Sequence, residues 1–231
     1  MAKFNSILAF GDSTPSGCEL AHGLEKYRSR DYMTGKVSIE ELDAPGKLLA
    51  FPQIVADHFG VPCHNYAMSG GSNTRSLRLI TQAVQEHPDS VVLFGYGPTN
   101  RTEFYRPEGG LGCDKDKFFQ TGPNNYDLHV NREFLEIVKP HNNLKEIMFC
   151  VDAICKLYTK DYLHITLFTE DNPDEVPDFG NSIDWENPRR NAEIWAKSKN
   201  YSKLVFHYGL DFHQALAKRI IDSLIEKGKV C

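Results

Sequence analysis

The chain has 231 residues, a net charge of −5 and an isoelectric point near 6.0. This length is typical of one α/β domain, so we expect residues 1–231 to form a single domain around its own hydrophobic core. The acidic balance argues against a nucleic-acid-binding protein, and 41% hydrophobic with 25% charged residues is the composition of a globular chain, not a disordered one.

Short apolar runs alternate with longer segments of helical periodicity. The predicted strands are 6–10, 61–66, 90–94, 164–168 and 204–206, and the predicted helices are 47–59, 72–86, 132–158 and 211–227. Residues 101–130 are expected to form a loop-rich excursion, and the acidic stretch 170–190 a loop. Strands separated by helices predict a three-layer α/β/α, flavodoxin-like fold, with a parallel sheet covered by helices on both faces. Ligands of such sheets bind at the carboxyl ends of the strands.

A serine follows directly on the first predicted strand, in the sequence Gly11-Asp12-Ser13. A serine hydroxyl is a weak nucleophile that needs a base and an exposed position, and a turn led by glycine supplies the exposure. Ser13 is therefore a candidate nucleophile, although the same tripeptide is also typical of a turn or a helix cap.

Two more segments that follow predicted strands carry candidate oxyanion donors. The stretch 65–73 contains Gly70 and Gly71, whose missing side chains let backbone N–H groups approach a ligand closely. The loop after the next strand contains Asn100, whose amide could donate to an oxyanion, a contact typically worth about 3–4 kcal/mol in acyl transfer. The structural alternatives are a glycine turn with Ser72 as a helix cap, and an asparagine bonded to its own backbone.

Two histidines, His207 and His213, lie between the last predicted strand and the last predicted helix. A histidine at the carboxyl end of a strand faces the same crevice as Ser13, which is where a general base is needed. The topology therefore favours a catalytic role for one of the two.

These four blocks, in this order and on these elements, resemble the SGNH (GDSL-like) hydrolase superfamily. The stretches GDSTPSGCEL and NYAMSGGSN are especially similar to its small bacterial and bacteriophage-type members, and the resemblance covers nearly the whole chain. It implies that Ser13 is the nucleophile and that the N–H groups of Ser13 and Gly70, with the Asn100 side chain, form the oxyanion hole. It also implies a base histidine shortly before the C-terminal helix.

The chain departs from the family pattern in two blocks. The third block usually reads Gly-x-Asn-Asp, whereas two residues separate Gly97 from Asn100 here and Arg101 takes the place of the aspartate. The last block usually reads Asp-x-x-His, but neither His207 nor His213 has an aspartate three residues before it.

His207 is preferred as the base, because the Leu, Ala and Ile residues of the following helix then fall where the family carries them. In that register the acid that orients the imidazole is missing, a loss that can cost roughly 10⁴-fold in a triad enzyme. Asp211 and Asp184 are the candidates for that acid, a Ser–His dyad is the other arrangement, and His213 remains the alternative base.

The chain is thus predicted to be a serine esterase or deacetylase that hydrolyses a small-molecule or glycan ester without a cofactor. The segments 101–130 and 170–190 are long enough to form a lid that selects the substrate. A catalytically weakened SGNH fold that serves as a binding or host-interaction protein is the alternative, motivated by the missing acid. A nucleotide-binding protein is disfavoured because neither GxGxxG nor GxxxxGK[ST] is present.

The remaining composition bears on compartment and metals. Neither a signal peptide nor an apolar run approaching the roughly 18–20 residues of a membrane span is evident, so no membrane partner is expected. The histidines show no metal-ligand spacing such as HExxH, so no metal site is predicted. Six scattered cysteines without a CxxC pair predict reduced thiols and a cytoplasmic protein: Cys18, Cys63, Cys113, Cys150, Cys155 and Cys231.

Overall fold

A computed structural model describes most of the elements predicted above. The described residues are 3–18, 20, 21, 29, 31, 34, 36–97, 101–105, 118–121, 144–158, 160–166, 182–184 and 208–228. The helices are α1 (Ser13–Ser16), α3 (Ile39–Lys47), α4 (Phe51–Phe59), α5 (Asn73–Glu86), α7 (Leu144–Leu157) and α9 (Leu210–Glu226). The strands are β1 (Ser6–Phe10), β2 (Cys63–Asn65), β3 (Ser90–Tyr96), β4 (Thr102–Tyr105), β5 (Phe118–Thr121), β6 (Asp161–Thr166) and β7 (Ser182–Asp184).

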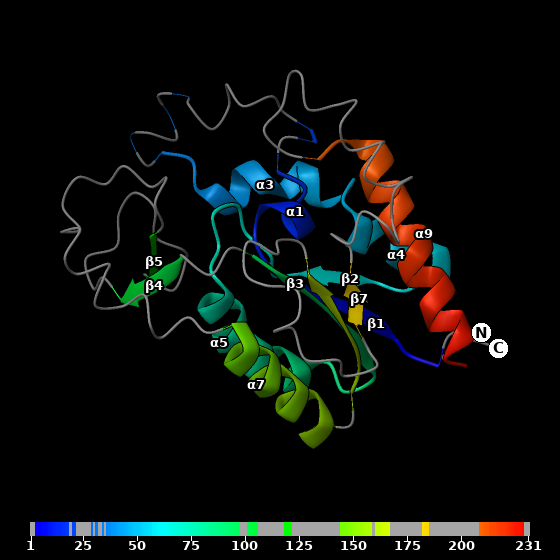
Figure 1. The fold of residues 1–231 in the computed structure, drawn as a ribbon. Coiled ribbons are helices and arrows are strands. Elements are labelled where there is room, and N and C mark those ends of the chain that lie inside the picture. The colour runs from blue at the N-terminus through cyan, green and yellow to red at the C-terminus, as the bar shows by residue number, and fades with distance from the viewer. Residues whose placement is uncertain are drawn as a thin grey trace.

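Five of the strands form one parallel sheet in the order β2-β1-β3-β6-β7, and β4 and β5 pair antiparallel in a separate ribbon (Figure 1). Counted along the chain, the sheet has the order 2-1-3-4-5, which is the flavodoxin-like arrangement. In this order the chain leaves β1 for one edge and returns to β3 on its other side. The carboxyl ends of β1 and β3 therefore flank the switch point where such folds bind ligands.

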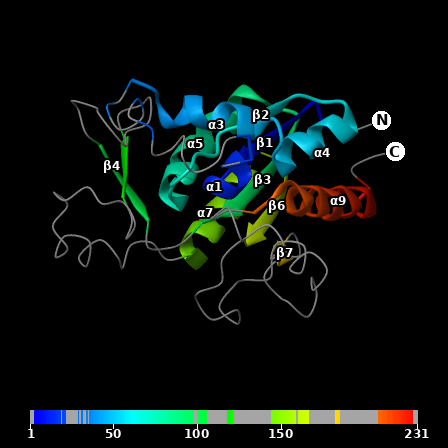
Figure 2. The same cartoon turned by 90° about the horizontal axis from the view of Figure 1, so that it is seen from above.

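Helices cover both faces of the sheet, with α4 and α9 on one face and α5 and α7 on the other (Figures 1 and 2). Alternate residues of β3 point to opposite faces, as a strand requires: Val91 and Leu93 join the core under α4 and α9, while Val92 and Phe94 join the core under α5 and α7. Both cores are apolar, which explains why the strands read as continuous hydrophobic runs. The predicted three-layer α/β/α fold is confirmed.

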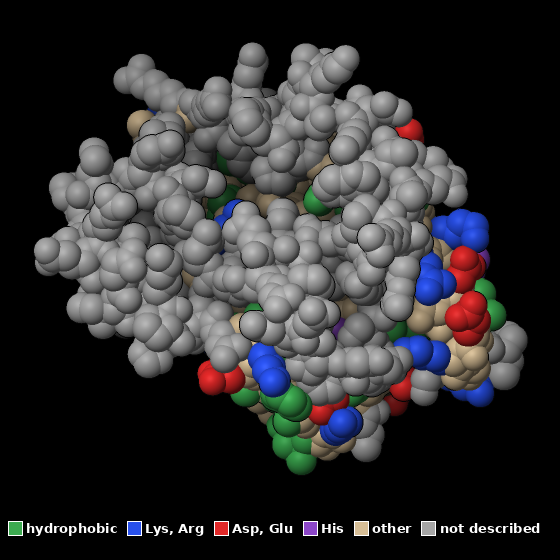
Figure 3. Space-filling view, viewed as in Figure 1, with side chains coloured by type: hydrophobic (Ala, Val, Ile, Leu, Met, Phe, Trp, Pro, Cys, Tyr) green, Lys and Arg blue, Asp and Glu red, His purple; other side chains and the backbone are tan. Residues whose placement is uncertain are grey.

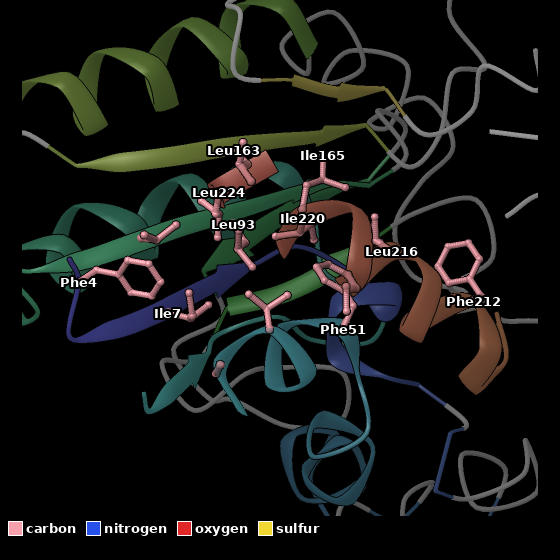
Figure 4. Packing of buried hydrophobic residues seen from close by; sticks show 14 residues of the cluster. Phe4, Ile7, Phe51, Leu93, Leu163, Ile165, Phe212, Leu216, Ile220 and Leu224 are labelled. Carbon is pink, nitrogen blue, oxygen red and sulfur yellow. The ribbon is translucent and has the colours of Figure 1, made fainter. Parts of the chain in front are cut away.

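The core between the sheet and the helices α4 and α9 contains side chains from both layers. Figure 4 shows side chains of these helices, among them Phe51, Leu216 and Ile220, directed toward Leu93 and Ile165 of the sheet. Each fully buried aliphatic or aromatic side chain of this kind stabilises the fold by about 1.5–3 kcal/mol relative to an exposed one.

The prediction of one helix over 47–59 is wrong at its start. The helix α4 begins only at Phe51, and a separate helix, α3, ends at Lys47. Helix α3 begins at a capping box in which Ser38 Oγ accepts from Glu41 N at 3.2 Å and Ser38 N donates to Glu41 Oε2 at 2.7 Å. Pro45 has no N–H for the helical ladder, and the helix ends two residues later. Leu48 and Leu49 continue the apolar stripe in the sequence, but they lie in the break between the two helices and are exposed.

Two segments predicted as loops contain short strands. The acidic stretch 170–190 includes β7, which pairs in parallel with β6 at the edge of the sheet. The excursion 101–130 includes the ribbon of β4 and β5. The predicted strand 204–206 and residues 132–143 of the predicted helix lie outside the described residues.

The described cysteines, Cys18, Cys63, Cys150 and Cys155, are free thiols. Burial raises the pKa of Cys63 and of Cys155 to about 12, so both remain protonated near neutral pH. Within the described ranges, no three His, Cys, Asp or Glu side chains gather as a metal site would need, and no helix has the length and apolarity to cross a membrane.

A buried imidazole lies in the middle of the sheet. His164 of β6 has no exposed surface, and its Nδ1 lies 2.7 Å from the Tyr96 hydroxyl. Burial lowers the pKa of His164 to about 4, although the Asp152 carboxylate nearby opposes this shift. The unfolded chain therefore binds a proton more readily than the folded one between about pH 6.5 and pH 4, and stability falls as the pH falls through this window.

We expect His164 to contribute up to about 3 kcal/mol to the loss of folding free energy between neutral pH and about pH 4. His164→Gln offers Tyr96 a polar partner that does not titrate, so its free energy of unfolding should depend less on pH. Urea unfolding at a series of pH values measures this. His58→Gln, on the exposed surface of α4, is the control and should keep the wild-type dependence; an equal dependence in His164→Gln and wild type would contradict the assignment.

Candidate active site

The loop after β1 presents Ser13 at the start of a short helix. Gly11 has a φ of 142°, and a Cβ there would lie 2.5 Å from the Gly95 carbonyl oxygen, so only glycine fits this turn. Asp12 caps α1, because its Oδ1 accepts from Thr14 N at 3.1 Å. Ser13 is the first residue of that helix.

The carbonyl of Ser13 accepts hydrogen bonds, whereas its hydroxyl and its backbone N–H form none with the described residues. Its carbonyl accepts from Ser16 Oγ at 2.9 Å and from Cys18 N at 3.0 Å. Within the part of the chain that the structure describes, neither the Ser13 hydroxyl nor its backbone N–H has a hydrogen-bond partner. The backbone of Ser13 is thus held through its carbonyl, while no described residue occupies its hydroxyl or its N–H.

The second block forms a tight turn in which Gly70 and Gly71 have different roles. Gly71 N donates to the Met68 carbonyl at 2.8 Å and so closes the turn. Gly70 takes the third position with a φ of 74°, where the turn favours glycine, and a Cβ there would meet no described atom within 4 Å. The Gly70 N–H takes no part in closing the turn, so it is the one that remains available as a donor.

Backbone and side-chain hydrogen bonds join the loops after β1, β2 and β3. Met68 N donates to the Gly11 carbonyl at 3.2 Å, which holds the glycine turn against the loop of Ser13. Asn73, in the first turn of α5, bonds to Gly97 twice: its Nδ2 donates to the Gly97 carbonyl at 3.0 Å, and its Oδ1 accepts from Gly97 N at 2.9 Å. The three loops therefore form one connected surface at the carboxyl ends of the strands.

Arg101, the residue in place of the family's aspartate, forms an ion pair with the residue next to Ser13. Its Nη1 lies 3.0 Å from Asp12 Oδ2, and the Asp12 side chain is only 1% exposed. Gly97 allows this approach, because a Cβ there would lie 3.1 Å from Asp12 Oδ2. A second pair, between Arg78 of α5 and Glu103 of β4, joins the start of the ribbon to α5, with both contacts at 3.1 Å.

The described residues include His213 but not His207. His213 is 1% exposed, and its Nδ1 accepts from Phe51 N at 3.1 Å. This bond caps α4, whose N-cap residue Ala50 has no side chain that could do so. The imidazole also stacks on the Phe51 ring, with the ring centroids 6.0 Å apart.

The other predicted residues are placed as follows. Asn100 and His207 lie outside the described residues. Asp211 is exposed in the first turn of α9, and Asp184 ends β7 opposite Thr166, at the carboxyl edge of the sheet. Figure 3 shows a small part of the described surface in this region, where hydrophobic side chains and a basic one lie among backbone and other side chains.

The structural roles of three residues in this region were not anticipated from the sequence. These residues are Asn73, which bonds to Gly97, Asp43, which bonds to Ser69, and His213, which caps α4. Asn73 and His213 act across 24 and 162 residues of sequence, so no local pattern reveals their partners. Asp43 lies on α3, and the Ser38-x-x-Glu41 capping box was the local signal that could have revealed that helix.

No protein-family model and no curated protein matches the sequence. Among solved structures, the psychrotrophic esterase EstA from Pseudoalteromonas sp., in a structure inhibited by monoethylphosphonate, is similar with a TM-score of 0.51 and 10% identity, over 98% of this chain and 100% of that one. A carbohydrate esterase, whose active site is described as having divergent catalytic and non-catalytic binding functions, matches with a TM-score of 0.42 and 16% identity, over 96% of this chain and 65% of its own length. The chain thus shares its fold with an esterase.

The His213 cap can be tested by stability. His213→Phe keeps an aromatic ring on Phe51 but leaves the Phe51 N–H without its acceptor, so we expect the free energy of unfolding to fall by about 1–2 kcal/mol. His213→Asn restores a capping acceptor and should recover part of the loss. Urea unfolding measures both variants at neutral pH, where an unchanged stability of His213→Phe would show that the cap contributes nothing.

Proposed function

We propose that this chain is a serine esterase or deacetylase of the SGNH type. Ser13 is its nucleophile, His207 its base, and the N–H groups of Ser13 and Gly70 with the Asn100 amide hold the oxyanion. The observation that carries the proposal is the state of Ser13: its hydroxyl and N–H have no partner among the described residues, and the turn of Gly70 lies against its loop. Asp12, not Ser13, caps the helix, so capping does not occupy the Ser13 hydroxyl.

The glycine turn supports Gly70 as the second oxyanion donor. Gly71 N is occupied by the Met68 carbonyl, whereas the Gly70 N–H takes no part in closing the turn and its glycine borders open space. Two backbone donors that are fixed before the substrate arrives stabilise developing charge without reorganisation.

The ion pair of Arg101 supports Asn100 as the third donor. Arg101 is held on Asp12, so the third block is anchored to the nucleophile loop one residue after Asn100 in the chain. Consecutive Cα atoms are about 3.8 Å apart, which is why this anchor supports a role for Asn100 there. The guanidinium of Arg101 attracts the carboxylate of Asp12, whereas an aspartate at position 101 would repel it.

The cap on α4 supports His207 over His213 as the base. A neutral imidazole whose Nδ1 accepts a hydrogen bond carries its proton on Nε2, and neither nitrogen can then accept a proton from serine without breaking that bond. His213 thus serves the packing of α4 on α9, which leaves His207 for the chemistry. Asp184 at the carboxyl edge and the exposed Asp211 are the acids that could orient His207.

The reaction proceeds in two steps. The Ser13 oxygen bonds to the acyl carbon while its proton passes to His207, and the imidazolium then protonates the leaving alkoxide as the ester C–O bond breaks. Water attacks the acyl-enzyme, His207 takes the proton of that water, and Ser13 leaves with the proton restored. The negative oxygen that forms in each step lies between the N–H groups of Ser13 and Gly70.

The substrate class proposed is a small-molecule or glycan ester, and free thiols in the described part agree with the cytoplasm as the expected compartment. The runner-up is a weakened SGNH fold that binds an ester or glycan without turnover. The missing Asp-x-x-His acid favours it, because an imidazole without an orienting group is a poor base.

Turnover of p-nitrophenyl acetate by a set of variants tests the proposal. Ser13→Ala and His207→Ala should each lower kcat by about 10⁴-fold or more, and Asn100→Ala by about 10²–10³-fold. His213→Phe, which leaves the proposed machinery intact, should turn over close to the wild-type rate at a temperature where it is folded.

Three results would contradict this assignment. Activity that survives Ser13→Ala would exclude Ser13 as the nucleophile. Activity lost in His213→Phe but kept in His207→Ala would make His213 the base. A wild type that binds acetylated sugars but neither turns over the ester nor reacts with a fluorophosphonate would favour the binding protein.

A further inference from the structure

One face of α3 touches three of the segments near Ser13. Asp43, Gly46 and Lys47 lie on this face, three and four residues apart, as neighbours on a helix surface do. Asp43 contacts the glycine turn, Gly46 contacts the end of α1, and Lys47 contacts the last residue of β2.

Asp43 holds Ser69, the residue directly before Gly70, at two points. Its Oδ2 accepts from Ser69 N and its Oδ1 accepts from Ser69 Oγ, both at 2.6 Å, and the carboxylate has no exposed surface. Charge-assisted hydrogen bonds of this length are among the stronger ones in proteins. The two bonds hold the N, Cα and Cβ atoms of Ser69, and the turn bond from Gly71 N to the Met68 carbonyl restrains the rotation that follows. Together they orient the Ser69–Gly70 peptide, whose N–H belongs to Gly70.

The same carboxylate is connected to the nucleophile through two hydroxyls. Ser69 gives its single hydroxyl proton to Asp43, and Ser16 gives its single hydroxyl proton to the Ser13 carbonyl at 2.9 Å. The two hydroxyl oxygens lie 3.3 Å apart, close enough for the Ser16 proton to be shared with Ser69 Oγ. The position of the glycine turn is thus tied to the backbone of Ser13 itself.

The backbone of α3 lies against α1 at a contact that only glycines allow. A Cβ on Gly46 would lie 2.2 Å from the Gly17 carbonyl oxygen, and one on Gly17 would lie 2.3 Å from the Gly46 carbonyl oxygen. Lys47 Nζ donates to the Asn65 carbonyl at 3.0 Å, and Asn65 Nδ2 donates to the Pro15 carbonyl at 2.7 Å. Because these contacts hold α3 against α1, they also fix the position of Asp43 relative to α1.

We propose that Asp43 is a positioning residue that orients the Gly70 N–H toward the oxyanion formed at Ser13. This inference rests on the proposed function, because it gives that N–H its catalytic role. Asp43 itself touches no reacting atom. It acts through Ser69, and its charge is met by the two donors of Ser69, with Lys47 four residues further along the helix.

The test compares Asp43→Ala, Asp43→Asn and Ser69→Ala with Asp57→Asn, which makes the same change at an exposed carboxylate of α4. Asp43→Ala should lower kcat for p-nitrophenyl acetate by about 10²-fold or more, the typical loss for one oxyanion donor, with KM and the pH dependence of kcat/KM unchanged. Asp43→Asn can still accept from Ser69 N and should recover part of the rate. Ser69→Ala, which removes one of the two bonds, should have a kcat between those of Asp43→Ala and wild type. The kcat of Asp57→Asn should match that of wild type.

An Asp43→Ala protein that folds and keeps kcat near the wild-type value overturns the inference, as does a loss confined to KM. If Asp43→Ala does not fold, Asp43→Asn and Ser69→Ala decide by the same kcat criterion. If wild type itself is inactive, the proposed function is what fails. Amide hydrogen exchange at Ser69 then decides about the positioning: faster exchange in Asp43→Asn than in wild type supports it, and equal exchange overturns it.

Discussion

The close approach of the loops after β1 and β3 is the constraint on which the candidate site depends. A Cβ at Gly11 would lie 2.5 Å from the Gly95 carbonyl oxygen, and a Cβ at Gly97 would lie 3.1 Å from Asp12 Oδ2. Because both positions are glycine, the first loop can turn sharply over the end of β3. The carboxylate of Asp12 then reaches Arg101 on one side and caps the helix of Ser13 on the other. The parallel sheet brings the loops to one edge, and these glycines let them touch.

Further hydrogen bonds hold these loops in fixed positions relative to one another. The glycine turn is bonded to Gly11 through Met68, and the start of the third block is bonded to Asn73. From outside, α3 holds both the turn and the end of α1. A serine hydrolase needs such fixed donors, because hydrogen bonds that form without reorganisation stabilise the transition state most.

The sheet and its site were predictable from the sequence to the extent that local patterns determine them. The buried strands β1 and β3 are continuous apolar runs that end in glycines, so their ends and the candidate residues after them could be located directly. The helix α3 was missed because its contacts to the core are few and its stability depends on the capping box and on Gly46 meeting Gly17. The strand β7 has three residues and exists through its pairing with β6, which no window of sequence reveals. The role of His213 likewise depends on Phe51, which is distant in the chain.

Identification of the residue that a phosphonate modifies tests the central claim most directly. After reaction with a fluorophosphonate, tandem mass spectrometry of the peptide that contains residues 4–26 can separate an adduct on Ser13 from one on Ser6 or Ser16. The account predicts a single adduct, on Ser13 Oγ, because this hydroxyl has no partner among the described residues and the proposed oxyanion donors are the N–H groups of Ser13 and Gly70. An adduct on Ser16, on Ser69 or on any other residue, with Ser13 unmodified, would contradict it.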